Sequence, residues 1–197
     1  ISNMRLLELF SGTGSVGKAC STIGWEFISV DLILPADHNC DILDFNYKQY
    51  PKNHFDIVWA SCPCTEYSRA KSRGVRDIEG ANKIVLKTLE IIDFFDCKYW
   101  FIENPQTSLL KNQPFMIGLP FHDGDYCRYG TPYRKRTRIW TNFVYKSGSP
   151  LKLCNKKCGS MYGNRHIGSC GTGGQGKGHT KRYSDRTYTQ LEKYAIP

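Results

Sequence analysis

A cysteine and a glutamate each follow an apolar run of the sequence, and together they could act as the nucleophile and the proton donor of a covalent mechanism. Cys64 comes shortly after the run at 55–60, and Glu103 directly after the run at 99–102. If both runs are parallel strands of one sheet, their carboxyl ends lie at the edge where ligands bind. A thiolate there is a nucleophile, and a carboxyl group beside it is a proton donor. Buried, inert thiols are the alternative interpretation of Cys64 and its neighbour Cys62.

A glycine-rich turn near the start of the chain indicates a nucleoside-bearing cofactor. Gly12, Gly14 and Gly17 follow the apolar run at 5–10 with the spacing G-x-G-x-x-G, and Asp31 ends the next apolar run. Glycines allow the backbone to approach a ligand closely, and an acid at this place binds ribose hydroxyls. The pattern suits a dinucleotide as well as S-adenosylmethionine, and a tight turn without a ligand is the third interpretation.

Arg136 and Arg138 are two residues apart at the beginning of a further predicted strand, so on an extended backbone their side chains would point the same way. Two arginines on one face can bind a base carbonyl or a phosphate. An edge strand that its charges protect from aggregation is the alternative interpretation.

Three cysteines and a histidine in the last third have the residue types of a zinc site: Cys154, Cys158, Cys170 and His166, with His179 as another candidate. Zinc prefers four such ligands, and a segment with few apolar residues would gain much of its order from the ion. Free thiols are the alternative, because the three-residue gap between Cys154 and Cys158 is wide for a structural site.

The odd total of nine cysteines and the absence of a secretory signal pattern favour a reducing compartment, either cytoplasm or nucleus.

The net charge of +9 over 197 residues is unevenly distributed. Residues 1–126 carry 12 basic and 16 acidic side chains, whereas residues 127–197 carry 15 basic and 2 acidic ones. Such a basic segment predicts a polyanionic partner, and a solvated basic face is the alternative. A content of 40% hydrophobic and 13% aromatic residues excludes wholesale disorder. No apolar run reaches the roughly 20 residues of a membrane span, so no membrane contact is expected.

The elements that would position these residues alternate between strand and helix. Apolar runs predict strands at 5–10, 27–31, 55–60, 99–102 and 138–144, and helical spacing predicts helices at 16–23 and 79–96. Continuous apolar strands separated by helices indicate an α/β fold whose parallel sheet has helices on both faces. Residues 146–182 are rich in Gly, Ser, Lys, Cys and His without a period, which predicts a small irregular basic segment.

Taken in their order along the chain, these motifs resemble those of the cytosine-5 DNA methyltransferases. The run from Glu8 to Gly14 resembles the family's cofactor loop, and Pro63-Cys64 its nucleophile motif. Glu103-Asn104-Pro105 resembles its Glu-Asn-Val, and Arg136-x-Arg138 its arginine pair. Thr65 departs from the family's usual Gln, and the large target-recognition domain is missing, which suggests a short member of viral or phage type.

The resemblance implies a Rossmann-like, S-adenosylmethionine-dependent enzyme that methylates carbon 5 of cytosine in flipped-out bases of DNA. The implied catalytic residues are Cys64, Glu103, Arg136 and Arg138. The implied cofactor-binding residues are Phe10, Ser11, Gly12, Gly14, Asp31, Leu32, Asp41, Ile42 and Pro63. Basic and polar side chains expected on the nucleic acid are Ser68, Arg69, Lys71, Arg73, Arg76, Arg134, Lys156, Lys157 and Arg165.

The implied domain organisation has three parts. Residues 1–145 form the catalytic domain, 146–185 a reduced target-recognition segment with the candidate zinc ligands, and 186–197 a return to the cofactor pocket. Methylation of RNA, a catalytically impaired nucleic-acid-binding relative and a nicotinamide dehydrogenase remain as alternatives. The dehydrogenase leaves Cys64, Glu103 and the arginine pair unexplained.

Overall fold

The computed structural model of the chain describes residues 3–145 and 151–168. The expected return of residues 186–197 to the cofactor pocket lies outside these ranges, and so do the candidate ligands Cys170 and His179. Of the expected recognition segment, residues 151–168 are described.

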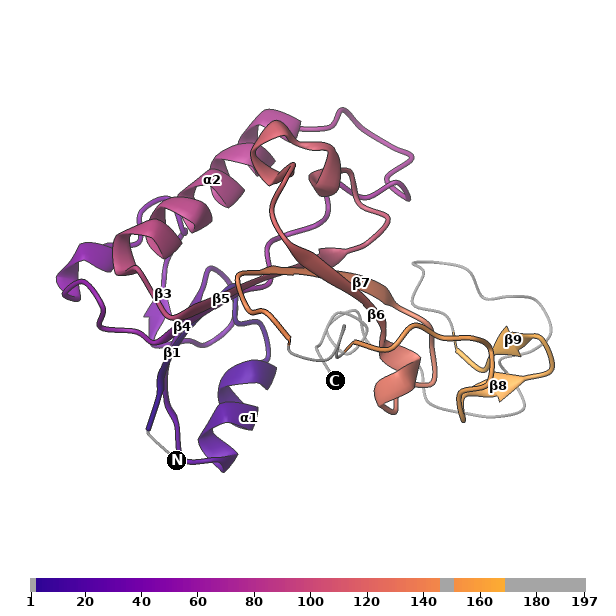
Figure 1. Ribbon diagram of the computed structural model, residues 1–197. Coiled ribbons are helices and arrows are strands. Elements are labelled where there is room, and N and C mark those ends of the chain that lie inside the picture. The colour runs from indigo at the N-terminus through magenta and orange to yellow at the C-terminus, as the bar shows by residue number, and fades with distance from the viewer. Residues whose placement is uncertain (1–2, 146–150, 169–197) are drawn as a thin grey trace.

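Seven strands of the described chain form one mixed sheet: β1 (Arg5–Leu9), β2 (Glu26–Asp31), β3 (His38–Asn39), β4 (Ile57–Ala60), β5 (Tyr99–Pro105), β6 (Phe121–Asp125) and β7 (Arg136–Thr141). Their order is β3-β2-β1-β4-β5-β7-β6 (Figure 1). The strands from β3 to β5 are parallel, whereas β7 is antiparallel to both β5 and β6. The carboxyl ends of β1, β4 and β5 therefore share one edge of the sheet.

Two α-helices lie on opposite faces of this sheet (Figure 1): α1 (Ser15–Thr22) and α2 (Ile78–Phe95). α2 begins where the Asp77 carboxylate accepts a hydrogen bond of 2.8 Å from the Gly80 amide. It buries one stripe at helical spacing, which includes Val85, Ile92 and Phe95. Short 3-10 helices lie in the connections: η1 (Tyr47–Gln49), η2 (Leu109–Asn112), η3 (Pro114–Met116) and η4 (Tyr126–Tyr129).

The predicted α/β class, with a mainly parallel sheet and helices on both faces, is confirmed. Two strands of this sheet are additional to the prediction. β3 is only two residues long, and β6 reads Phe-His-Asp-Gly-Asp, with no apolar run or alternation to indicate a strand. β6 exists because its backbone pairs with β7 along its whole length, which is a tertiary contact. β7 itself occupies Arg136–Thr141 instead of the predicted 138–144. β5 continues to Pro105 instead of ending at 102, because its last residues pair with β7, so Glu103 lies within the strand and not after it.

Residues 151–168 form a small irregular unit beside η4, with a two-stranded ribbon of β8 (Met161–Tyr162) and β9 (Arg165–His166). Backbone hydrogen bonds attach it to the sheet side. The Asp125 amide donates to the Lys152 carbonyl at 3.0 Å, and the Gly168 amide donates to the Pro132 carbonyl at 2.8 Å. In the described part of the chain, no helix has the length and apolar character needed to cross a membrane.

Candidate active site

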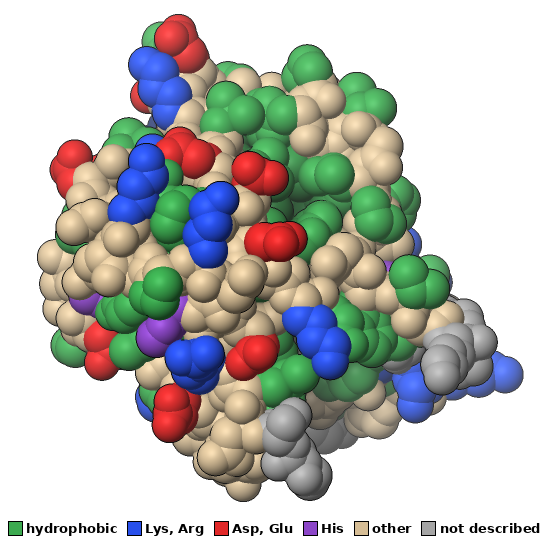
Figure 2. Space-filling model, turned by 60° about the vertical axis from the view of Figure 1, so that its left-hand side comes forward, with side chains coloured by type: hydrophobic (Ala, Val, Ile, Leu, Met, Phe, Trp, Pro, Cys, Tyr) green, Lys and Arg blue, Asp and Glu red, His purple; other side chains and the backbone are tan. Residues whose placement is uncertain are grey.

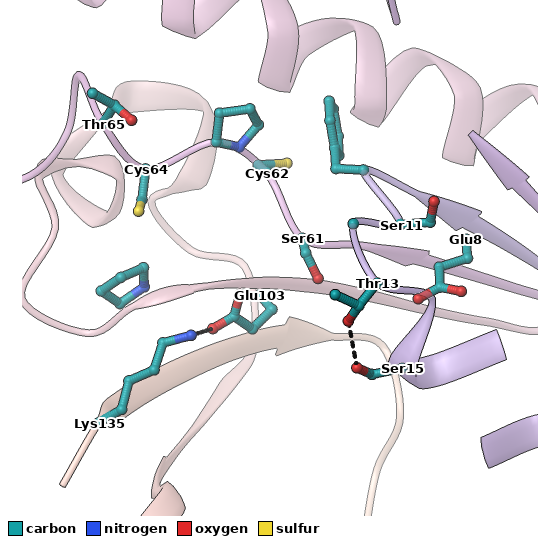
Figure 3. A pocket seen from close by; sticks show the side chains of 14 residues that line it. Glu8, Ser11, Thr13, Ser15, Ser61, Cys62, Cys64, Thr65, Glu103 and Lys135 are labelled. Carbon is teal, nitrogen blue, oxygen red and sulfur yellow. Dashed lines mark hydrogen bonds and ion pairs between the residues drawn. The ribbon is translucent and has the colours of Figure 1, made fainter. Parts of the chain in front are cut away.

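Cys64 lies in the loop that follows β4, and its sulfur faces a cavity of about 250 Å³ (Figure 3). The neighbouring strand β5 supports this loop, because the Asn104 side-chain amide donates a hydrogen bond of 2.9 Å to the Cys62 carbonyl. Further along the loop, Tyr67 is fully buried and its carbonyl accepts a hydrogen bond from the Leu109 amide. These contacts hold the Cys64 thiol at the carboxyl edge of the sheet, where the sequence predicts it.

Cys62 and Cys64 line the same cavity, but their thiols have different surroundings. Burial raises the pKa of the Cys62 thiol to about 12, and its sulfur lies 3.8 Å from the Thr88 hydroxyl. The pKa of the Cys64 thiol is also raised, first by burial and then by the Glu103 carboxylate, while the Lys135 ammonium acts to lower it. Because the thiolate is the nucleophilic form, the cation near Cys64 makes this thiol the better nucleophile of the two.

Glu103 and Lys135 lie on the side of the cavity toward which the Cys64 sulfur points (Figure 3), and with Tyr126 they form a buried polar cluster. The Glu103 Oε1 atom accepts a hydrogen bond from the Tyr126 hydroxyl at 3.3 Å and lies 3.4 Å from the Lys135 Nζ atom. That Nζ atom also lies 4.8 Å from the centre of the Tyr126 ring, which is a cation–π contact. The Glu103 carboxylate is therefore oriented by two partners that are themselves in contact.

The arginine pair requires a correction. Arg136 and Arg138 share one face of β7, as predicted, but their side chains bind acids of β6 and do not line the cavity. Arg136 contacts both carboxylate oxygens of Asp125 at 3.1 and 3.0 Å, and Arg138 contacts both of Asp123 at 2.8 and 2.9 Å. The register explains this, because Asp125 lies opposite Arg136 and Asp123 opposite Arg138 in the ladder.

Lys135 is a basic residue of the cavity that was not among the residues predicted from the sequence. Side chains alternate along an extended strand, so the assignment of Arg136 and Arg138 to one face places Lys135 on the other. That alternation was the available signal. Neither the charge pattern nor the spacing says which of the two faces is toward the cavity, and Lys135 is the residue found there.

Two adjoining cavities contain most of the predicted cofactor residues, and Phe10 and Pro63 line both. Ser11 and Gly12 line the cavity that holds Cys64. The second cavity, of about 80 Å³, contains the predicted residues from the carboxyl end of β2 and the loop after β3: Asp31, Leu32, Asp41 and Ile42. Gly14 lines neither cavity and instead precedes α1 in a left-handed conformation, with φ at 70°.

The first cavity has features that fit a polar cofactor. The Ser11 hydroxyl oxygen is buried and has no hydrogen-bond partner among the described residues, so it is available to a ligand. Gly12 has φ at +54° and no atom near its missing side chain, which leaves the backbone open to the cavity. Asp31 holds this turn in place, because its carboxylate accepts a hydrogen bond of 2.8 Å from the Gly12 amide. Its Oδ1 atom accepts hydrogen bonds from the Ile33 and Leu34 amides at 2.9 and 2.8 Å, which leaves about one acceptor position, on Oδ2, for a ribose hydroxyl.

The residues predicted to contact nucleic acid fall into two groups. Arg69, Arg73, Lys156, Lys157 and Arg165 are exposed. Others are engaged within the protein. Lys71 pairs with Glu66, the Arg76 guanidinium donates to three backbone carbonyls, and Arg134 lies 3.1 Å from Asp125. Ser68 is half-buried, and its hydroxyl accepts a hydrogen bond from the Ala70 amide.

Three of the four predicted metal ligands lie together: Cys154, Cys158 and His166. The structure adds Cys127, from η4, to this cluster. The predicted ligand Cys170 lies outside the described residues. Cys127 was missed because it is 27 positions away from Cys154 in sequence.

A family model described as C-5 cytosine-specific DNA methylase matches residues 4–113. This range contains Cys64 and Glu103 and ends before Lys135. A protein of Frog virus 3 (isolate Goorha), named "Probable DNA (cytosine-5)-methyltransferase", is 36% identical over 203 residues. The match covers 91% of this chain and 92% of the viral protein.

A similar solved structure is that of an E. coli prophage protein described as a "putative DNA modification methyltransferase". The TM-score is 0.54 at 14% identity, over 71% of this chain, and the likeness shows a shared fold. The chain covers 46% of that protein's length.

Proposed function

The chain belongs to the C-5 cytosine-specific DNA methylase family, and we propose that Cys64, Glu103 and Lys135 perform its reaction on cytosine in DNA. The observation that carries this proposal is the arrangement of the first cavity. A thiol faces a buried carboxylate–ammonium pair there, and the cavity adjoins a second one that has the residues expected for a nucleoside. A nicotinamide dehydrogenase would have no use for this thiol and carboxylate.

In the proposed reaction, the Cys64 thiolate attacks carbon 6 of cytosine. A carbon–sulfur bond forms, and electron density moves onto carbon 5. The Glu103 carboxyl group hydrogen-bonds ring nitrogen 3 and the exocyclic amino group, and Lys135 and Tyr126 keep it in position as charge develops. After carbon 5 has been methylated, it loses its proton to water and the bond between carbon 6 and the Cys64 sulfur breaks. The ring regains its double bond and the thiolate is restored.

S-adenosylmethionine, when bound, supplies the methyl group to carbon 5 as an electrophilic carbon on a sulfonium. Phe10, Ser11 and Gly12 would hold its amino-acid part, and Asp31, Asp41 and Ile42 its adenosine, because these residues line the two adjoining cavities. The target cytosine must leave the base stack, since carbon 6 is inaccessible to a protein thiol within a duplex.

The test is transfer of labelled methyl groups from S-adenosylmethionine to duplex DNA, single-stranded DNA and RNA. We expect label in DNA, its complete loss in Cys64→Ser, and no loss in Cys20→Ser, a substitution on α1 away from the cavity. DNA containing 5-fluorocytosine should trap a covalent complex with the wild-type protein, because the fluorine at carbon 5 cannot leave as a proton does.

Three results would contradict the proposal. Equal labelling by Cys64→Ser would remove the covalent mechanism. Labelling of RNA alone would make RNA the substrate. Cofactor binding without any transfer would indicate an impaired, nucleic-acid-binding relative.

A further inference from the structure

We propose that Cys127, Cys154, Cys158 and His166 bind a zinc ion that fixes the basic segment 151–168 to the catalytic sheet. The inference goes beyond methyl transfer, which uses none of these four side chains. It replaces Cys170, the ligand expected from sequence proximity, with Cys127.

The four ligand atoms converge from three parts of the chain. Cys127 is in η4, Cys154 and Cys158 flank a tight loop, and His166 is in β9. The three sulfur atoms and one imidazole nitrogen lie within 4.8 Å of one another. His166 Nε2 is 3.4 Å from the sulfur of Cys154 and 3.4 Å from that of Cys158. Zinc bonds of about 2.3 Å to sulfur and about 2.0 Å to nitrogen place tetrahedral ligands roughly 3.5–3.8 Å apart. The cluster is therefore of the size that one ion requires.

The donor set indicates zinc and a structural site. Three thiolates and one imidazole suit zinc, whereas calcium and magnesium prefer oxygen ligands. Four protein ligands leave no position open for a substrate, which is typical of structural centres. The backbone also supports a thiolate. Lys156 has a left-handed conformation, with φ at 64°, and its amide donates to the Cys154 sulfur at 3.3 Å.

Hydrogen bonds attach the segment 151–168 to the sheet side, but the segment has little apolar burial to hold it together. Cys158 is its one buried residue in the part of the chain that the structure describes, and the segment has four basic side chains and no acid. A hydrophobic core therefore cannot supply its folding free energy, whereas a structural zinc ion can. Lys156, Lys157 and Arg165, which are expected on DNA, lie between or beside the proposed ligands.

Cys127 also connects the metal site to the catalytic cluster. The preceding residue, Tyr126, donates its hydroxyl hydrogen bond to Glu103. Before it, the Asp125 carboxylate accepts the amide of Cys154 at 2.7 Å. Three consecutive residues thus have different partners. Asp125 contacts the basic segment, Tyr126 contacts the Glu103 carboxylate, and Cys127 would bind the proposed ion. We expect removal of the ion to loosen both the segment and the support of Glu103.

The test is the metal content of the full chain, purified under reducing conditions without chelators. We expect about one zinc per chain in the wild type and in the control Cys20→Ser, and less than about one tenth of that in Cys127→Ser and Cys158→Ser. If these variants fail to fold, cobalt(II) added to chelator-treated wild type provides the second measurement. It should give visible bands of a tetrahedral site with thiolate-to-cobalt charge transfer.

Cys170→Ser distinguishes the two ligand sets. The structure predicts that this variant keeps its zinc, whereas the set expected from the sequence predicts that it loses it. Three outcomes would overturn the proposal. They are full metal content in Cys127→Ser, loss of metal in Cys170→Ser, and a wild-type protein that binds neither zinc nor cobalt. A disulfide between two of the three cluster cysteines in place of metal would do so as well. None of these outcomes depends on whether methyl transfer occurs.

Discussion

At the residue scale, the buried pair of Lys135 and Glu103 has two effects on the Cys64 chemistry. In the proposed reaction its carboxylate hydrogen-bonds the base, and its ammonium counters the rise in the Cys64 pKa that burial and Glu103 cause. A carboxylate alone in this cavity would orient the base and suppress the nucleophile at the same time. The neighbouring cation reduces that conflict, so one ion pair serves both needs.

Lys135→Met should shift the thiolate chemistry of Cys64 to higher pH. Lys135 lowers the Cys64 pKa, so its removal raises that pKa, and the rising limb of activity against pH should move to higher pH. The measurement is the pH dependence of single-turnover methyl transfer, together with the alkylation rate of Cys64 by iodoacetamide.

Arg138→Ala is the matched control, because it removes a cation that is three positions from Lys135 and does not line the cavity. It should leave that limb in place and instead lower the free energy of unfolding by about 1 kcal/mol, through loss of the Asp123 pair and the stacking on Phe121. A shift of the pH limb in Arg138→Ala, without one in Lys135→Met, would restore the arginine pair to the catalytic role.

At the scale of elements, the loop between β4 and α2 contains cations with different tasks. Arg76 donates hydrogen bonds of 3.0, 2.6 and 3.0 Å to the carbonyls of Glu66, Ser68 and Lys71, so it organises the loop. Arg73 lies in the same loop and is exposed. In the sequence, Arg73 and Arg76 are equivalent basic residues of one stretch. Their roles differ because the loop folds around the Arg76 guanidinium and leaves Arg73 exposed.

Arg73→Ala should weaken binding to every DNA sequence and reduce the slope of log affinity against log salt by roughly 0.9, the value for one phosphate contact. Hydrogen exchange in the loop should stay unchanged. The comparison is Arg76→Ala, in which we expect faster exchange in residues 65–77, because three backbone carbonyls lose their donor. An unchanged salt slope in Arg73→Ala would show that the loop does not contact phosphates.

At the scale of the whole molecule, the boundary between the acidic front and the basic back of the sequence is not a boundary in space. β7, from the basic part, lies between β5 and β6. Arg134, Lys135, Arg136 and Arg138 therefore pair with the front acids Glu103, Asp123 and Asp125. The face shown in Figure 2 likewise has basic and acidic side chains interspersed. The basic surface proposed for DNA is thus narrower than the charge count suggests, and it includes the exposed Lys156, Lys157 and Arg165.

The double substitution Lys156→Glu with Lys157→Glu should weaken DNA binding at least about tenfold and leave S-adenosylmethionine binding unchanged, because the cofactor residues lie in the front part. Lys48→Glu with Lys52→Glu is the matched control. It makes the same change of net charge at exposed positions near η1, and we expect little effect on DNA affinity. Filter binding at several salt concentrations measures the first quantity, and calorimetry the second. Equal loss in both double variants would indicate a net-charge effect without a defined surface.

Local sequence was enough to predict the parallel sheet, the two helices, the position of Cys64 after its strand, and the glycine turn. Each of these depends on a periodic apolar pattern or on a turn residue that acts within a few positions. Glu103 was expected after its strand and lies within β5. The tertiary structure decided what depends on pairing between distant segments. The register of β6 and β7 turned Arg136 and Arg138 toward acids and Lys135 toward Glu103. The fold also brought Cys127 to Cys154, Cys158 and His166 across 27 or more positions. Sequence spacing could not indicate this set, because metal ligands need only be close in space and can be far apart in the chain.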